Sequence, residues 1–192
     1  MLKRLIAVAI FGLLVYLGYL ATGEFRQGQK FLDGKFYDKA LAQWSPLANG
    51  ENKLPVITTV FGLFDYETRS QQKVGSIYMH RDDGKTNVPE AIKFFNRAAA
   101  NGDEISQFTL AQEYSNSIAP DPKGKIREAH FEKDMVIAHM WATVALEQKT
   151  KKSRKYQKYI KMYEQEMSAD DIAKAKSLAT VCGESSFQNC GY

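Results

Sequence analysis

Two cysteines and three histidines are the side chains of this chain best suited to metal or redox chemistry. Cys182 and Cys190 are eight positions apart, and an isolated pair at this spacing favours a disulfide bond that closes a short loop. The pair lacks the C-x-x-C spacing of redox motifs, and no histidine lies near enough in sequence to complete a zinc site. His130 and His139 lack a metal-ligand spacing, so we expect His139 to be an ordinary packed or exposed side chain.

The remaining motifs predict no catalytic residue, no cofactor-binding residue and no metal ligand. Asp82-Asp83-Gly84 resembles part of a calcium loop but lacks the other ligands, so it favours a turn. Glycine-rich phosphate loops, nucleophile elbows and zincin motifs do not occur in the sequence. We therefore expect a protein that is not an enzyme and that uses no cofactor.

Positive charge is concentrated in one segment near the C-terminal end. Between Glu147 and Glu164 there is no acidic residue, and the segment contains Lys149, Lys151, Lys152, Arg154, Lys155, Lys158 and Lys161. Apolar and tyrosine residues recur there at helical spacing, namely Tyr156, Tyr159, Ile160, Tyr163 and Met167. The pattern predicts an amphipathic helix whose outer face is either simply solvated or a contact surface for an acidic partner or anionic lipid. The predicted contact residues are Lys151, Lys152, Arg154, Lys155 and Lys158.

The N-terminal segment has the character of a membrane helix. Lys3 and Arg4 precede a run without charge from Leu5 to Ala21, which as a helix would span about 25 Å. The basic flank would stay in the cytoplasm, so the rest of the chain would cross the membrane. Cleavage as a signal peptide after this run, or burial as a core helix, are the alternatives to a retained anchor.

Composition and charge argue against a disordered chain and against a nucleic-acid-binding protein. The chain has 192 residues, of which 44% are hydrophobic and 25% are charged, as in folded globular proteins. Its formal net charge of +4 is mild, and we find no nucleic-acid-binding motif, so we expect no nucleic-acid partner.

The candidate residues above must be positioned by the rest of the fold, and three stretches of it repeat one pattern. They cover residues 40–48, 91–99 and 138–146. Each begins with an alanine, continues with an aromatic residue three or four positions later, and ends on a small or apolar pair. The initial alanines are 51 and 47 residues apart, a period typical of solenoid arrays. The aromatic residues are Trp44, Phe94 with Phe95, and Trp141.

A partner helix is predicted before each stretch, with a small residue followed three positions later by an aromatic one: Gly28 and Phe31, Gly75 and Tyr78, and Ala111 and Tyr114. Asn87 and Ser168 are predicted helix starts, and Gly50 and Gly102 predicted helix ends. Residues 51–73 are predicted to form a lengthened or extra helix, and residues 119–133 an inserted loop. The polar residues most suited to line a ligand groove are Ser76, Gln107, Gln112 and Glu113.

These repeats resemble the Sel-one-like repeat family, which is related to the tetratricopeptide repeats. The middle unit matches best, through Val74, Gly75, Tyr78, Ala91, Phe94, Ala98, Ala99 and Gly102. The third unit has Ala111 in place of the first glycine and Lys149 at the position of the final one, whereas the first unit has its aromatic residue shifted to Trp44. Family members linked to enzyme activity have a cysteine pair in each repeat, and this chain has one pair outside its repeats.

The resemblance implies an all-α fold, a short α-solenoid of stacked helix hairpins. The residues outside the repeats add an N-terminal transmembrane or signal helix and a C-terminal capping helix region. The predicted parts are an anchor or signal helix (1–24), about three repeats (25–180) and a disulfide-closed tail (181–192). The implied function is a non-enzymatic protein–protein interaction scaffold on the periplasmic face of a bacterial inner membrane, or a soluble periplasmic protein if the helix is cleaved. Its partner would be a membrane-complex subunit or a periplasmic peptide. An accessory subunit or assembly factor is the alternative, and an enzyme of cell-wall or antibiotic turnover the third.

Overall fold

The computed structural model describes residues 10, 12, 23, 25–51, 65–116 and 129–190. Over these ranges the chain is helical apart from turns and connections, and no strand occurs in them, which confirms the all-α fold class. A helix over residues 25–33 is followed by α2 (Tyr37–Ala48), α4 (Tyr66–His80), α5 (Val88–Ala100), α6 (Glu104–Ser115), α7 (Met135–Glu147), α8 (Ser153–Glu164) and α9 (Ala169–Glu184). Much of the predicted segment 51–73 and of the predicted loop 119–133 lies outside the described residues.

Side-chain caps set the first residue of five of these helices. In each, an Asp, Asn or Ser side chain accepts a hydrogen bond from the backbone N–H three residues later, which satisfies an otherwise unpaired donor. The capping residues of α4, α5, α6, α7 and α9 are Asp65, Asn87, Asp103, Asp134 and Ser168. The helix starts predicted at Asn87 and Ser168 are therefore confirmed.

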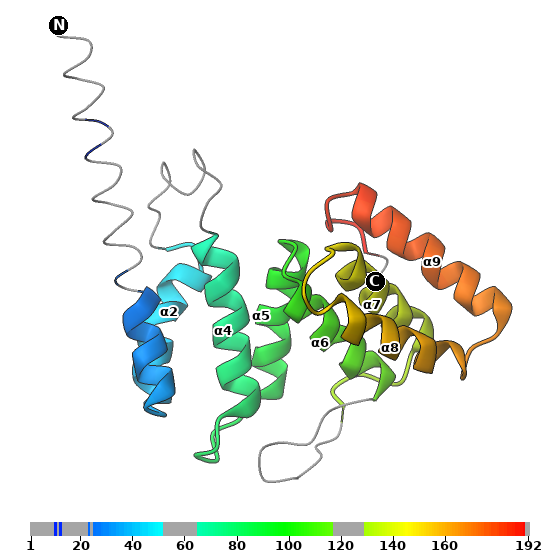
Figure 1. Cartoon of the computed structure of the whole chain (residues 1–192). Helices are drawn as coiled ribbons and strands as arrows, with labels where there is room; N and C mark the ends of the chain where they lie inside the picture. Colours follow the sequence, from blue (N-terminus) through cyan, green and yellow to red (C-terminus); the bar gives the residue numbers. More distant parts are fainter. Residues whose placement is uncertain are drawn as a thin grey trace, which may run out of the picture.

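The helices follow one another in a row, as Figure 1 shows from the blue segment at residues 25–33 to α7. Neighbouring elements α2 and α4, α4 and α5, α5 and α6, and α6 and α7 are in contact, and α8 and α9 both pack on α7. From α2 to α8, each helix therefore contacts its neighbours in the chain, as in a solenoid of stacked hairpins, whereas α9 packs back on α7.

One backbone hydrogen bond recurs at the turn of each hairpin. The N–H of the residue before the second helix donates to the carbonyl of the aromatic residue on the first helix. The three bonds are Phe36 to Phe31, Asn87 to Tyr78 and Asp134 to Tyr114, each 2.8 Å long. The three hairpins therefore close in the same register, although the connections between the paired residues differ in length.

Small residues allow the two helices of a hairpin to approach each other closely. A methyl group added at Gly28 would overlap the indole of Trp44, and one added at Gly75 would lie 3.2 Å from both the Ala91 carbonyl and the Phe95 ring. Trp44 and Phe95 thus hold equivalent places, each four residues after the first alanine of its repeat. The aromatic of the first repeat is therefore not shifted relative to the second, and the equivalent of Trp44 is Phe95 instead of Phe94.

In each of the three hairpins, the second helix is followed by a residue in the same backbone conformation. Gly50, Gly102 and Lys149 have φ angles of +68°, +87° and +51°, which place all three in the left-handed region. Lys149 adopts this conformation although its side chain makes it unfavourable. The helix ends predicted at Gly50 and Gly102 are confirmed, and Lys149 adopts the conformation of the glycine it replaces.

Buried glutamines join each hairpin to the next one. The Gln71 side-chain amide donates to the Ala48 carbonyl (3.2 Å), and the Gln107 amide donates to the Ala99 carbonyl (3.1 Å). Gln107 and Glu113 are 0% and 1% exposed, so the expectation that they line a ligand groove was wrong. They are packed within the solenoid, where Gln107 satisfies a carbonyl at the end of the preceding helix.

The substitution Gly28→Ala should destabilise the protein by about 1–3 kcal/mol, because the new methyl group must displace the packed Trp44 ring. The same change at Gly75 should cost less, since the nearest atoms there are 3.2 Å away and alanine is the better helix former. Urea unfolding followed by far-UV circular dichroism measures both. A Gly28→Ala protein as stable as the wild type would show that this approach is not tight.

Replacing Lys149 with glycine should stabilise the protein by about 1 kcal/mol relative to Lys149→Ala. Both variants lose the charge, and only glycine relieves the left-handed backbone, so the pair isolates the conformational effect. The midpoint of urea unfolding reports the difference. Equal midpoints would refute the assignment of Lys149 to the glycine position of the repeat.

Candidate functional site

The predicted amphipathic helix is α8, and its inner face is buried as expected. Tyr156, Ile160 and Tyr163 are between 0% and 8% exposed. The Tyr156 ring lies 4.6 Å from the Phe108 ring of α6, centroid to centroid, and burial raises the pKa of its hydroxyl. The Tyr163 hydroxyl lies 3.1 Å from the hydroxyl of Ser115, which donates to it. α8 is therefore anchored on α6 by its tyrosines.

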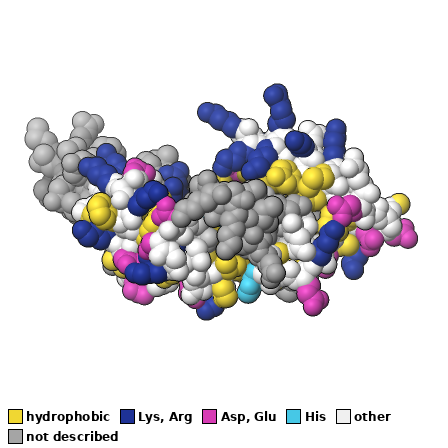
Figure 2. Space-filling model, turned by 90° about the horizontal axis from the view of Figure 1, so that it is seen from below, with side chains coloured by type: hydrophobic (Ala, Val, Ile, Leu, Met, Phe, Trp, Pro, Cys, Tyr) yellow, Lys and Arg dark blue, Asp and Glu magenta, His cyan; other side chains and the backbone are white. Residues whose placement is uncertain are grey.

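The five predicted contact residues are all exposed: Lys151 and Lys152 come directly before α8, and Arg154, Lys155 and Lys158 lie on it. Lys161 is exposed as well, and we call these six side chains the basic face. Figure 2 shows the dark-blue side chains of this region projecting together from the surface over α8. Lys152 lies 3.7 Å from Glu104, and the other five basic side chains form no ion pair with a residue that the structure describes.

His139, which is fully buried, joins three helices beneath this face. Its Nε2 lies 3.3 Å from the Glu164 carboxylate at the end of α8, and its Nδ1 lies 3.2 Å from the Thr143 hydroxyl. Because a carboxylate only accepts, Nε2 donates to Glu164, and Nδ1 then accepts from Thr143. Glu164 also pairs with Lys176 of α9 at 3.2 Å. Burial lowers the pKa of His139, so the neutral ring links α7 to α8 and, through Glu164, to α9.

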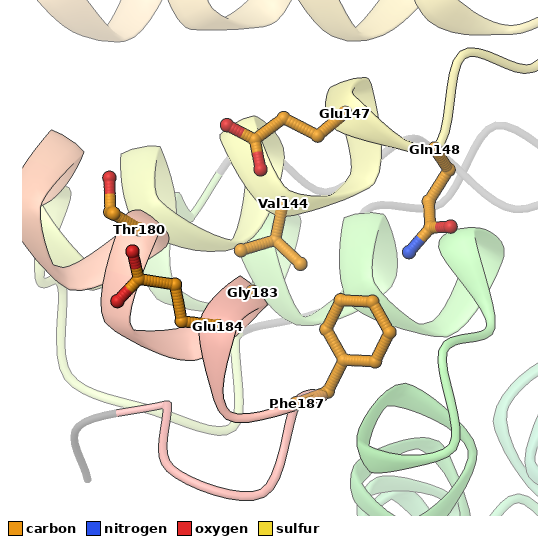
Figure 3. A pocket seen from close by; sticks show the side chains of 7 residues that line it. All are labelled: Val144, Glu147, Gln148, Thr180, Gly183, Glu184 and Phe187. Atoms are coloured by element: carbon orange, nitrogen blue, oxygen red, sulfur yellow. The ribbon is translucent and has the colours of Figure 1, made fainter.

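A pocket of about 440 Å³ lies between the ends of α7 and α9. Figure 3 shows its lining residues, Val144, Glu147, Gln148, Thr180, Gly183, Glu184 and Phe187. We call it the α7–α9 pocket. Glu147 and Glu184 are exposed and form no ion pair within the described residues, whereas Val144 is 1% exposed and supplies an apolar floor. The pocket combines an apolar surface with two free negative charges.

The predicted disulfide bond between Cys182 and Cys190 is present and shapes one side of this pocket. Between the two cysteines, Ser186 and Phe187 both have positive φ angles, and the Phe187 N–H donates to the Cys182 carbonyl at 2.8 Å. The Phe187 ring packs at Gly102, where an added Cβ would lie 3.1 Å from it. The loop therefore returns from α9 to the turn between α5 and α6.

The carboxylates of Asp82 and Asp83 are occupied by basic side chains. Arg81, whose side chain is 4% exposed, donates to Asp83 at 2.6 and 2.7 Å and to Asp38 of α2 at 2.7 Å. Hydrogen bonding to Arg81 lowers the pKa of Asp83 to about 2. Lys35 and Tyr37 hold Asp82 at 2.5 and 2.9 Å. These residues form a bend that ties α2 to the connection between α4 and α5, and no group of three metal-binding side chains occurs in the described ranges.

Sequence reasoning found the basic face and the disulfide but missed the α7–α9 pocket and the His139–Glu164 pair. Glu147 and Glu184 are 37 positions apart and belong to no motif, so only the packing of α9 on α7 brings them together. For His139 the sequence predicts only an ordinary packed or exposed side chain, with no partner. Its partner Glu164 is the acidic residue that ends the basic segment in the sequence. That position indicates where the positive charge ends but does not indicate a contact with His139.

The predicted anchor from Leu5 to Ala21 lies outside the described residues, apart from Ile10 and Gly12. Among the helices that the structure does describe, none combines the length and the apolar character needed to cross a bilayer. Comparison with known proteins found no matching family model, no matching curated protein and no matching solved structure.

The free energy of unfolding should fall as the pH falls below about 6.5, because the folded protein holds His139 neutral and its lowered pKa opposes protonation. The stability gained from this pKa difference is present above pH 6.5 and is lost as the pH falls toward the pKa of the folded state. His139→Gln keeps a donor for Glu164 and should flatten this slope, whereas His130→Gln, at an exposed position, should retain it. Urea unfolding between about pH 5 and 8 measures the slopes. An unchanged slope in His139→Gln would contradict the assignment.

Proposed function

We propose that this protein is a non-enzymatic scaffold of Sel-one-like helical repeats, held at a membrane by its N-terminal segment, that binds a segment of another protein. The observation that carries the proposal is the α7–α9 pocket at the end of the hairpin array. A solenoid presents its side chains on a continuous surface, and such surfaces commonly bind extended partners. At one end of this surface, the pocket would offer a partner both apolar contacts and two carboxylates.

The lining of the pocket fits a basic side chain of the partner. The aliphatic part of a lysine or arginine would pack on Val144 and Phe187, and its charged group would approach Glu147 and Glu184. A volume of about 440 Å³ accommodates such a side chain. Because the two carboxylates have no counter-ion within the described chain, a partner cation would complete the charge balance.

Two sequence features support a location at the outer side of a bacterial inner membrane. The uncharged run from Leu5 to Ala21 follows two basic residues, an order that places the downstream chain outside the cytoplasm. The disulfide between Cys182 and Cys190 is compatible with an oxidising compartment. The partner in this proposal is a subunit of a membrane complex or a periplasmic peptide.

Charge reversal in the pocket should release the partner. Crosslinking in intact membranes, followed by purification of the tagged full-length chain, should recover the partner with the wild type and about tenfold less of it with Glu147→Lys or Glu184→Lys. Quantitative mass spectrometry of the crosslinked material measures recovery. The loss follows because a partner cation would meet a like charge at the same place.

Glu132→Lys is the matched control, because Glu132 is an exposed glutamate outside the pocket. Equal recovery in all three variants would refute the pocket as the binding site. A chain lacking residues 1–24 tests the anchor separately. Recovery that depends on this segment and is insensitive to the pocket would favour an accessory subunit held through its membrane helix.

A further inference from the structure

The basic face of α8 carries more positive charge than the fold itself uses. Its six side chains lie between positions 151 and 161, and all are exposed. Lys152 approaches Glu104 at 3.7 Å, and the Lys155 ammonium lies 4.8 Å from the centre of the Phe108 ring. The remaining four have no carboxylate partner among the described residues. Most of this charge is therefore directed to the solvent.

The arrangement of these charges opposes the stability of α8. The first turn contains Arg154 and Lys155 and no acidic residue, and the Lys152 side chain does not cap the helix. Positive charge at the N-terminal end of a helix is unfavourable to its dipole. Within the helix, Arg154 with Lys158 and Lys158 with Lys161 are also like-charged pairs, at spacings of four and three residues. An external anionic surface would remove both penalties.

One apolar side chain lies within this charged surface. Met162 is 38% exposed and lies on the side of α8 away from the buried Tyr156 and Ile160. In an α-helix it is a neighbour of Lys158, four positions earlier, and shares a face with Lys155, seven positions earlier. Lysines around an exposed apolar residue are typical of helices that lie in the headgroup region of a membrane.

The composition of the basic face favours lipid over an acidic protein. Five of its six side chains are lysines, which act as mobile point charges, whereas arginine is preferred for fixed two-pronged contacts with a carboxylate. The α7–α9 pocket is lined by residues of α7, α9 and the disulfide loop and by none from α8. A fluid layer of anionic headgroups needs no pocket, only a row of charges along an exposed helix.

We propose that α8 docks on anionic phospholipid headgroups through Lys151, Arg154, Lys155, Lys158 and Lys161, with Met162 entering the boundary between headgroups and acyl chains. This inference rests on the proposed membrane location. It assigns to α8 a second contact with the bilayer, which would orient the hairpin array. The α7–α9 pocket then remains available for a protein partner.

The test uses the full-length chain with Met162→Cys, labelled with an environment-sensitive fluorophore and reconstituted in two kinds of membrane. One contains phosphatidylcholine alone, and the other contains phosphatidylcholine with phosphatidylglycerol. We expect a blue shift of the label and its quenching by brominated lipids only in the anionic membrane. Salt at about 1 M, where the Debye length is about 3 Å, should abolish both signals. The native cysteines are paired, so the label reports on α8 alone.

The variants Lys155→Gln and Lys158→Gln should each lower the equilibrium constant for docking about fivefold, and both together should abolish the blue shift. Lys174→Gln is the matched control, because Lys174 is an exposed lysine of α9 and should leave the signal unchanged. Far-UV circular dichroism checks that each variant is folded. Since Met162 is itself replaced, a second label position at Gln157, also exposed on α8, repeats the measurement with the methionine intact.

The same signal in both membranes, or none in either, would overturn the lipid assignment. A blue shift that requires added polyglutamate and ignores the lipid composition would assign the basic face to an acidic protein and would overturn it as well. Partner recovery through Glu147 and Glu184 is measured independently. Failure of lipid docking is thereby distinguished from failure of the proposed scaffold function.

Discussion

The close approach of two helices at a residue without a bulky side chain is the constraint on which each hairpin depends. At Gly28 the Trp44 ring occupies the space that a Cβ would take, and at Gly75 the Phe95 ring lies 3.2 Å from that position, so these rings define how near the helices lie. The first alanines of the three repeated stretches, Ala40, Ala91 and Ala138, are all 0% exposed and complete these contacts. Each hairpin buries its remaining apolar side chains against the adjacent hairpin. A change in the distance between its two helices would therefore alter the surface on which the adjacent hairpin packs.

The features that could be predicted from the sequence are those fixed by local backbone chemistry. Caps at Asn87 and Ser168 and helix ends at Gly50 and Gly102 depend on residues a few positions apart, and the alanine–aromatic pattern depends on the helical period. The pocket could not be predicted in this way. Helix α7 is buried almost all round, from Ile137 to Ala142, because α6, α8 and α9 cover its different sides. Its sequence therefore has no polar face to reveal which neighbour covers which side.

Two surfaces of opposite charge lie on α7 and on helices that pack against it. The basic face lies on α8, the two free carboxylates lie at the ends of α7 and α9, and both α8 and α9 rest on α7. Within this assembly the buried His139 is paired with Glu164, which also pairs with Lys176. By contrast, the exposed charges of the basic face and of the pocket are mostly unpaired within the described chain. This division indicates that the paired groups hold the helices together and that the unpaired ones are available for binding.

The disulfide loop makes the pocket a preformed site. Phe187 is held in a left-handed backbone conformation, its N–H is bonded to the Cys182 carbonyl, and its ring packs at Gly102 in the turn between α5 and α6. Gln188 donates to the Ala100 carbonyl at 2.9 Å and ties the same loop to the end of α5. Without the crosslink, ordering this loop would reduce the affinity for a partner, since side chains fixed only upon binding lose conformational entropy at that step. Because the bond from Cys182 to Cys190 orders the loop during folding instead, the aromatic wall would be in place before the proposed partner arrives. An oxidising compartment would then matter to this protein for binding as well as for stability.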